Sequence, residues 1–499
     1  MMRRAIALSV LFALVLCVTP AAAWAKKRAP SSTTTTTWAP LPATSTTVTW
    51  SDCGSGFECG TLPVPVDWRS PLGEQLPLAL VRHRAEGPDP RIGALLVNYG
   101  GPGQGGVDYL PRVWSRIPAP VRARFDIVSW DPRGTGASRP VDCVDDASLD
   151  DSMNLPAVPD TAASLAAVRA YNDTFAEGCK TRSGAYAGQV GTRNTARDLE
   201  AIRRALGETK LTYLGYSYGT VVGATYAQMY PSTVRAMVLD GPADWWAPRL
   251  DYVYAQAQGF KQALDAFLSS CGPACPAMLD GLVARIASGP LPASYVRNGV
   301  TRDGVLTSST LEVGVLSALY DLRAWPVLTS ALRSAAIDGW GGPLLSMADQ
   351  YFQRSTDGTY SSIVEANAVI NCVDHPEPVA PSAAQELAEV ARFQAALPPW
   401  GGNWAVAGCP GMPLPAKGDT LGDVQVKGAP PILIVATTGD PATPYAAAQS
   451  FLTRIAGSSL LTFDSTEHTA YGSGRSTCID DQVDPYLLDL VMPAAGTRC

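Results

Sequence analysis

The chain has 499 residues, of which 46% are hydrophobic, and a net charge of -7 at pH 7. That length allows a sizeable core, organised either as several domains or as one enlarged domain with an insertion. The acidic balance, with no basic stripe beyond the extreme N-terminus, argues against a protein that binds nucleic acid.

The first 25 residues are predicted to be a cleavable signal peptide. Two arginines precede an apolar stretch at 5–18, and small residues suitable for cleavage lie at 21–25. The apolar stretch is too short to span a bilayer comfortably, and no later segment is typical of a membrane span. Cys17 raises the alternative of a lipoprotein, but Leu16 stands where a small residue is expected. We therefore expect a secreted or cell-wall-associated protein.

The segment that follows, 26–50, is rich in Thr and Pro. A segment of this composition cannot bury a core, so it predicts an extended linker that is open to O-glycosylation. The folded part is expected to begin near Trp50.

The cysteines agree with export. Eleven occur, and setting Cys17 aside leaves ten, an even number that argues for disulfides in an exported protein. Other connectivities stay open, but local spacing suggests the pairs Cys53–Cys59 and Cys271–Cys275, and Cys478 is expected to pair with Cys499 and so to tie down the C-terminal tail. The pairs Cys143–Cys179 and Cys372–Cys409 would complete the set. No paired C-x-x-C units occur and histidine is scarce, so we expect no metal site. Nothing in the sequence implies a cofactor.

Downstream of the linker, short apolar stretches alternate with helical patterns. Strands are expected at 76–81, 94–97, 125–130, 211–214, 234–239, 431–436 and 460–463, and helices at 194–206 and 220–227. This alternation predicts a doubly wound, mostly parallel α/β sheet. It fails after about Trp245, so 246–370 is expected to form a mainly helical cap, inserted between two parts of the core at 51–245 and 371–499.

Ser217 is the candidate nucleophile. It is the centre of Gly-Tyr-Ser-Tyr-Gly at 215–219, between a predicted strand and a predicted helix. A strand that turns sharply into a helix exposes the serine hydroxyl on a strained backbone, and the flanking glycines let the two elements pass closely.

A serine hydroxyl needs a general base, and the chain offers three histidines. His468 follows the last predicted strand, whereas His83 ends an early strand and His375 lies beside a cysteine. A histidine that comes last along the chain, after the serine and an acid, fits one known order of the catalytic triad. His468 is therefore the candidate base.

The acid that orients this base is expected directly after a strand. Asp440 follows the strand at 431–436 and can accept a proton-bearing nitrogen of His468. Its Gly-Asp-Pro context is also ordinary turn chemistry. Asp240, at the end of the strand at 234–239, is the alternative acid.

Two segments are candidates for stabilising an oxyanion. One is the backbone N–H of Tyr218, and the other is the glycine-rich loop after the strand at 94–97, where Gly100 or Gly101 is the expected donor. This loop lacks the Lys-Ser/Thr ending of a phosphate-binding loop. A further motif at 131–138 is expected to be a structural turn in which Arg133 braces neighbouring loops.

Taken together, these motifs resemble the tripeptidyl-aminopeptidase-like branch of the α/β-hydrolase serine peptidases, which actinobacteria export and which is related to the prolyl aminopeptidases. The resemblance runs from about Cys53 to Cys499 and rests on 100–103, 131–138, 215–219, 370–374, 439–440, 467–468 and the cysteines 478 and 499. Tyr99 stands where the family commonly has Pro and the prolyl enzymes have His, so proline specificity is not implied.

The resemblance implies an α/β-hydrolase fold and cleavage of short peptides from a free N-terminus. Such an enzyme needs an anionic group for the substrate's ammonium, and Asp374 and Glu365 are candidates, with a purely structural role as the alternative. An esterase or lipase that acts on small esters is the second hypothesis, because the triad does not choose between ester and amide. A non-catalytic wall-associated binding protein is the third. The oligomeric state stays open.

Overall fold

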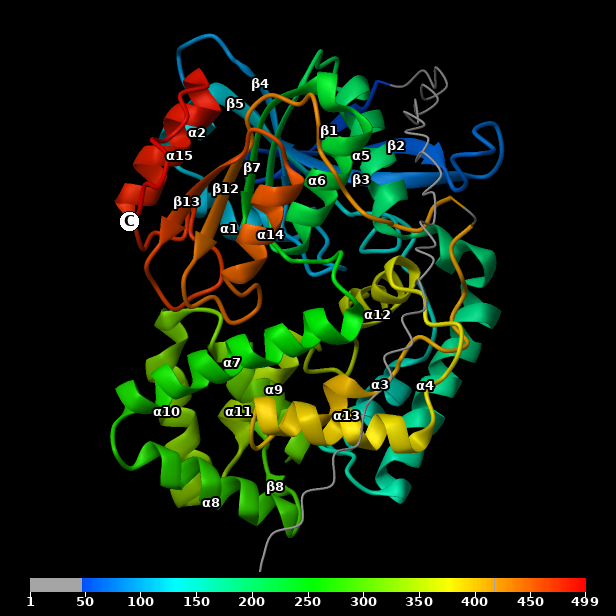
Figure 1. The fold of residues 1–499 in the computed structure, drawn as a ribbon, viewed down its shortest axis with the longest axis vertical. Coiled ribbons are helices and arrows are strands. Elements are labelled where there is room, and N and C mark those ends of the chain that lie inside the picture. Colours follow the sequence, from blue (N-terminus) through cyan, green and yellow to red (C-terminus); the bar gives the residue numbers. More distant parts are fainter. Residues whose placement is uncertain (1–46, 417) are drawn as a thin grey trace, which may run out of the picture. The chain divides into compact units, whose positions relative to one another are not determined.

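A nine-stranded sheet with the strand order β1-β2-β3-β5-β4-β6-β7-β12-β13 lies in the upper half of the protein in the view of Figure 1. In the computed structural model, which describes residues 47–416 and 418–499, strands β1 to β3 pair antiparallel and the strands from β5 to β13 in that order are parallel. The strands are β1 (Thr49–Gly54), β2 (Phe57–Pro65), β3 (Gln75–His83), β4 (Gly93–Asn98), β5 (Phe125–Trp130), β6 (Leu211–Tyr216), β7 (Val234–Asp240), β12 (Leu433–Thr437) and β13 (Ser459–Phe463). The predicted mostly parallel α/β sheet is confirmed.

Helices cover both faces of this sheet, which is why its central strands are continuous apolar stretches. Strands β4, β5 and β12 are buried along their whole length, as expected of parallel strands enclosed on both sides. Helices α1, α2 and α15 share one apolar cluster with the strands. Helix α6 packs against β6 and β7, and α5 packs against α6. The helices of this part of the chain are α1 (Tyr109–Val113), α2 (Ala119–Arg124), α3 (Asp146–Ser152), α4 (Ala162–Arg182), α5 (Thr192–Ala205), α6 (Tyr218–Met229), α14 (Ala446–Arg454) and α15 (Thr477–Asp489).

A second group of helices lies between β7 and β12 along the chain, below the sheet in the view of Figure 1. It comprises α7 (Arg249–Cys271), α8 (Cys275–Ala287), α9 (Ser308–Ala318), α10 (Trp325–Arg333), α11 (Gly342–Tyr351), α12 (Ile363–Asp374) and α13 (Ala383–Ala396), with the short strands β8 (Leu291–Pro292), β9 (Tyr295–Arg297), β10 (Val300–Arg302) and β11 (Val305–Leu306). Among the described residues no single helix is long and apolar enough to cross a membrane, and only the bent pair α7–α8 meets the criterion on length and composition.

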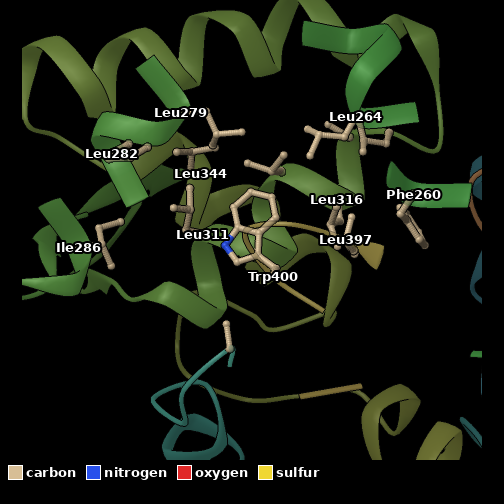
Figure 2. Packing of buried hydrophobic residues seen from close by; sticks show 14 of the residues in the cluster. Phe260, Leu264, Leu279, Leu282, Ile286, Leu311, Leu316, Leu344, Leu397 and Trp400 are labelled. Atoms are coloured by element: carbon tan, nitrogen blue, oxygen red, sulfur yellow. The ribbon is translucent and has the colours of Figure 1, made fainter. Parts of the chain in front are cut away.

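This group of helices, α7 to α13, which we call the cap, has an apolar core of its own. Figure 2 shows Phe260, Leu316, Leu397 and Trp400 packed together with leucines from α8, α9 and α11. Leu397 and Trp400 follow α13, and buried residues of α4 join the same cluster. The cap core therefore draws on helices outside the predicted segment 246–370, because α4 and α13 bury their apolar faces against it.

Five disulfides link the cysteines of the described residues, and they are the five pairs expected from the sequence. Cys478–Cys499 fastens the C-terminal residue to the start of α15, and Cys143–Cys179 joins the segment after β5 to the end of α4. Disulfides of this number are typical of proteins outside the cytoplasm. The predicted signal peptide and most of the predicted linker lie outside the described residues.

Candidate active site

The candidate triad residues follow strands that are neighbours in the sheet. Ser217 follows β6, Asp440 lies just after β12, and His468 comes after β13, while Asp240 is the last residue of β7. These four strands are parallel, so their carboxyl ends meet at one edge, where open α/β sheets bind ligands. The sheet thus brings together residues that are up to 251 positions apart, from Ser217 to His468.

The backbone at Ser217 has the conformation of a sharp strand-to-helix turn. Its φ of 54° and ψ of -125° are strained for a residue with a side chain. Hydrogen bonds hold the turn in place: the amide of Ser217 donates to the carbonyl of Asp240 at 2.9 Å, and the amide of Thr220 donates to the carbonyl of Ser217 at 2.9 Å. A Cβ on Gly215 would lie 2.4 Å from the carbonyl oxygen of Gly219, so glycine is required there. Ser217 itself is half-buried.

His468 is hydrogen-bonded to Asp440. Its Nδ1 lies 2.9 Å from both carboxylate oxygens of Asp440. The buried carboxylate is oriented by the amides of Ala442 and Thr443 and by the hydroxyl of Thr443. Burial lowers the pKa of His468, but the charge of Asp440 and its hydrogen bond outweigh this effect, so the pKa is raised above its ordinary value. Asp440 therefore holds the proton on Nδ1 and stabilises the charged imidazole.

Nε2 of His468 and the hydroxyl of Ser217 are not occupied by hydrogen bonds to other groups of the described residues. Across the described part of the chain, neither atom makes a hydrogen bond, with each other or with any third group. Catalytic hydrogen bonds are often long before substrate binds and tighten in the complex. Both atoms are thus available for proton transfer with a substrate in place.

The alternative acid, Asp240, binds the backbone of the loop that carries His468 and not its imidazole. Its carboxylate accepts the amides of Ala470 at 2.9 Å and Tyr471 at 2.8 Å, and makes no hydrogen bond to His468. Burial raises the pKa of Asp240 to about 7. Asp240 therefore anchors the loop that carries the histidine, and Asp440 is the carboxylate that orients the imidazole.

The glycine-rich loop after β4 lies directly against the serine turn. Gly100 has a φ of 87°, and a Cβ there would be 2.6 Å from the carbonyl oxygen of Tyr216 and 3.1 Å from the amide nitrogen of Tyr218. The amide of Gly100 already donates to Oδ1 of Asn98 at 2.9 Å. The amides of Gly101 and Tyr218 have no partner among the described residues, so these two, rather than Gly100, are the donors available to an oxyanion.

A cavity of about 560 Å³ opens beside this loop, between the sheet edge and the cap. Gly101 and Pro102 form part of its wall, together with Trp245 after β7 and aromatic side chains of the cap such as Tyr320. The volume lies within the usual range for small-molecule sites, which are mostly apolar with a few polar groups.

The comparisons with known proteins agree with this geometry. The family profile described as the alpha/beta hydrolase fold matches residues 93–475. The chain belongs to the α/β-hydrolase family. This hydrolase is 37% identical to the serine protease Hip1 of Mycobacterium tuberculosis over 91% of each chain. It is 34% identical to carboxylesterase B of M. tuberculosis, over 88% of this chain and 86% of the relative. It is 33% identical to the tripeptidyl aminopeptidase of Streptomyces coelicolor, over 91% of this chain and 86% of the relative.

Arg133 of the hydrolase is a structural residue, as the sequence predicted. Its fully buried guanidinium makes two 2.6 Å contacts with Asp198 and donates to the carbonyls of Pro65, Val66 and Gln189. Arg133 therefore joins the end of β2 to α5 and to the turn before α5. It does not touch the triad.

The two carboxylates expected to hold a substrate's ammonium are used elsewhere, and neither lines the cavity. Asp374 accepts hydrogen bonds from the amide and hydroxyl of Thr192 and from the indole of Trp245 at 3.0 Å. Glu365 accepts the amides of Cys143 at 2.6 Å and Val144 at 3.0 Å. The structure supports the alternative role for both, because they fasten α12 to neighbouring segments.

Sequence reasoning missed two residues of the site. The carbonyl of Tyr320 accepts a hydrogen bond from the amide of His468 at 2.9 Å, and the two rings meet edge to face at 5.3 Å, so the cap directly contacts the loop that carries His468. Glu312 of α9 is buried and lines the cavity. A signal for Glu312 was present in the sequence: it is the one charged residue of its helix, with no Lys or Arg three or four positions away.

Proposed function

We propose that this hydrolase is an exported serine aminopeptidase that releases short peptides, of the tripeptidyl type, from free N-termini. The observation that carries the proposal is the 2.9 Å pairing of His468 with Asp440 beside the Ser217 turn, under a cap that closes over the cavity. The similarity to Hip1 and to the Streptomyces tripeptidyl aminopeptidase supports peptides as the substrate class.

The geometry performs the reaction through an acyl-enzyme. The oxygen of Ser217 attacks the scissile carbonyl while Nε2 of His468 removes its proton, and the amides of Gly101 and Tyr218 donate to the resulting oxyanion. The imidazolium then gives that proton to the leaving amine, which departs as the amide bond breaks. Water, deprotonated by His468, hydrolyses the ester and restores the serine hydroxyl. Asp440 keeps the imidazole oriented throughout.

A cap above the triad favours release from a chain end over cleavage within a chain. The cavity lies between the sheet edge and helices of the cap, including α7 and α9. A short N-terminal segment can occupy such a space, whereas a chain that continues in both directions would have to pass through the cap. This supports exopeptidase action.

The second candidate is an esterase, and the similarity to carboxylesterase B is the observation that favours it. The test compares kcat/KM for aminoacyl-, dipeptidyl- and tripeptidyl-p-nitroanilides with that for p-nitrophenyl esters, with Ser217→Ala as the blank. We expect the tripeptidyl amide to be the best amide substrate. Turnover of esters alone would reject the peptidase.

A further inference from the structure

The glycine-rich loop after β4 lies against helix α12 of the cap as well as against the serine turn. A Cβ on Gly103, whose φ is 101°, would lie 3.0 Å from the carbonyl oxygen of Ile363 and 3.1 Å from the amide nitrogen of Asn367. A residue without a side chain lets the loop come this close to the backbone of the helix. The cap therefore borders the loop that carries Gly101, one of the two amides available to an oxyanion.

One side chain of α12 donates a hydrogen bond to this loop. Nδ2 of Asn367 donates to the carbonyl of Pro102 at 3.0 Å, one residue after Gly101. Nδ2 of Asn371 donates to Oδ1 of Asn367 at 3.1 Å, so the carboxamide of Asn367 is oriented with its NH2 group toward the loop. Among the described residues, no other group donates to the carbonyl of Gly101 or of Pro102. This hydrogen bond is therefore what ties that part of the loop to the cap.

Helix α12 is itself fastened to the rest of the protein on both sides of Asn367. Glu365, two residues earlier, accepts two amides of the segment that follows β5. Asp374, two turns later, accepts the amide of Thr192 at the start of α5. A side chain on a well-held helix fixes its partner more precisely than one on a free loop does. Asn367 is thus a fixed point for the loop beside it.

We propose that Asn367 is a positioning residue of the oxyanion hole: it holds the carbonyl of Pro102, and through the loop backbone it keeps the amide of Gly101 directed at the oxyanion. The inference rests on the proposed function, in which this amide stabilises the oxyanion. Such donors are effective because their positions are fixed before the charge develops. A glycine-rich loop that loses its tether populates other backbone conformations, and its amide then points at the oxyanion for a smaller part of the time.

This role differs in its kinetics from a purely structural one. The oxyanion exists only in the transition state and the intermediate, so loss of its donor lowers kcat and leaves KM nearly unchanged. A thionoester, in which sulfur replaces the carbonyl oxygen, gives a second distinction. Sulfur accepts only weak hydrogen bonds, so hydrolysis of the thionoester depends less on the oxyanion donors. A displaced donor should therefore slow the ester more than the thionoester.

The test is Asn367→Leu, assayed with a p-nitrophenyl ester and with the p-nitrophenyl thionoester of the same acid. Leucine has a similar size and shape but donates no hydrogen bond, and it adds no charge near the oxyanion. We expect kcat for the ester to fall about 10- to 100-fold, as for a catalytic group that is misplaced but still present. KM should stay nearly unchanged, and the ratio of the two kcat values, ester over thionoester, should fall.

Asn172→Leu is the matched control. Asn172 of α4 is also half-buried, also lines the cavity and also donates its Nδ2 to a backbone carbonyl, that of Ala407 at 3.2 Å. Ala407 lies outside the loop after β4, so this variant should keep the wild-type ratio of ester to thionoester turnover. Thermal unfolding verifies that both variants are folded. If Asn367→Leu does not fold, Asn367→Ala replaces it, because it also removes the donor.

Three results would overturn the inference while the hydrolase stands: an unchanged ester-to-thionoester ratio in Asn367→Leu, an equal fall of that ratio in Asn172→Leu, or a loss of ester activity that lies in KM alone. Failure of the proposed function has a different signature, because it appears in the wild type. A wild type that turns over esters but no tripeptidyl amide rejects the peptidase, and the assigned role of Asn367 in ester hydrolysis is still decided by the ratio.

Discussion

At Asp440, five hydrogen-bonding groups converge on one carboxylate. Two amides and a hydroxyl from the following turn fix its orientation, and the imidazole of His468 and the amide of Thr469, the latter at 3.4 Å, are the other two. The same residues that close the Gly-Asp-Pro turn therefore also orient the carboxylate that pairs with His468. The turn and the contact with the histidine, which were alternative interpretations of the sequence, are both present at this residue.

Asp440→Asn should lower kcat by about 10⁴-fold, because an asparagine no longer enforces the correct tautomer of His468. Asp240→Asn is the matched control: it is equally buried but binds the amides of Ala470 and Tyr471. It should lower the melting temperature and reduce kcat much less. Steady-state kinetics and thermal unfolding measure the two effects, and a larger kcat loss in Asp240→Asn would assign the acid to that residue.

The raised pKa of His468 has a consequence for the pH profile. The general base must be neutral, so activity is lost as the pH falls through the pKa of this histidine. Because that pKa is raised, the acid limb of kcat/KM should have its midpoint above 6.5, the ordinary value for histidine. A p-nitrophenyl ester is the right substrate, since it carries no titrating amine. A midpoint at or below 6.5 would contradict the effect of Asp440.

Single residues show where sequence reasoning reaches its limit. Ser217 could be predicted because its motif is local in the sequence. His468 could be predicted because the chain has only three histidines and this one comes last along the chain. Asp440 and Asp240 both follow strands, so only their contacts separate them. Asp374 looked available in the sequence, but the partners that occupy it, Thr192 and Trp245, are remote along the chain.

At the scale of elements, the turn after β6 and the loop after β4 lie in contact with each other. The parallel register places Asn98 of β4 opposite Gly215 of β6, so both connections leave the sheet at the same level. Asn98 then holds the amide of Gly100. Neighbouring strands thus set the position of the oxyanion loop relative to the nucleophile.

Gly100→Ala should reduce kcat about 100- to 1000-fold, the usual cost of losing an oxyanion donor, because a Cβ would push the loop away from the carbonyl of Tyr216. Gly184→Ala is the control: its φ is also positive, at 58°, but nothing lies within 4 Å of the added Cβ. Both variants carry backbone strain, so equal losses of activity would mean that strain, and not loop position, is responsible. Kinetics with fluorophosphonate titration of active sites distinguishes the cases.

The predicted strands begin and end within two residues of the observed strands, because their apolar stretches are continuous and have clear ends in the sequence. Strands β1 and β2 were not predicted. They form an antiparallel pair at the edge, where β1 is mostly exposed and β2 carries two prolines. An edge strand with polar positions and prolines has a weak pattern.

On the scale of the whole molecule, the candidate triad lies at the edge of the sheet, and the cavity lies between that edge and the cap. The chain leaves the core after β7 and returns to it at β12, and α4 adds to the cap from the N-terminal side. The sequence predicted the insertion from the loss of alternation. It did not reveal that α4 and α13 share the cap core, because an amphipathic helix does not specify which surface it covers.

The five disulfides of the described residues are typical of a protein outside the cytoplasm, and the signal peptide stays a prediction. We expect the mature protein to be recovered outside the cytoplasm with its N-terminus near residue 25. Expression in an actinobacterial host, followed by N-terminal sequencing and counting of free thiols, measures both features. An intact N-terminus with ten free thiols in the cytoplasmic fraction would contradict export.

The central claim is that Ser217 is the nucleophile of a peptidase, and its most direct test is covalent labelling coupled to turnover. Wild type should incorporate one fluorophosphonate at Ser217, located by mass spectrometry of the labelled peptide, and lose tripeptidyl-amide hydrolysis in proportion. Ser217→Ala should take up no label and show kcat lower by roughly six orders of magnitude, since a triad acts as a unit. A wild type that takes up no label, or a Ser217→Ala variant that retains activity, would contradict the account.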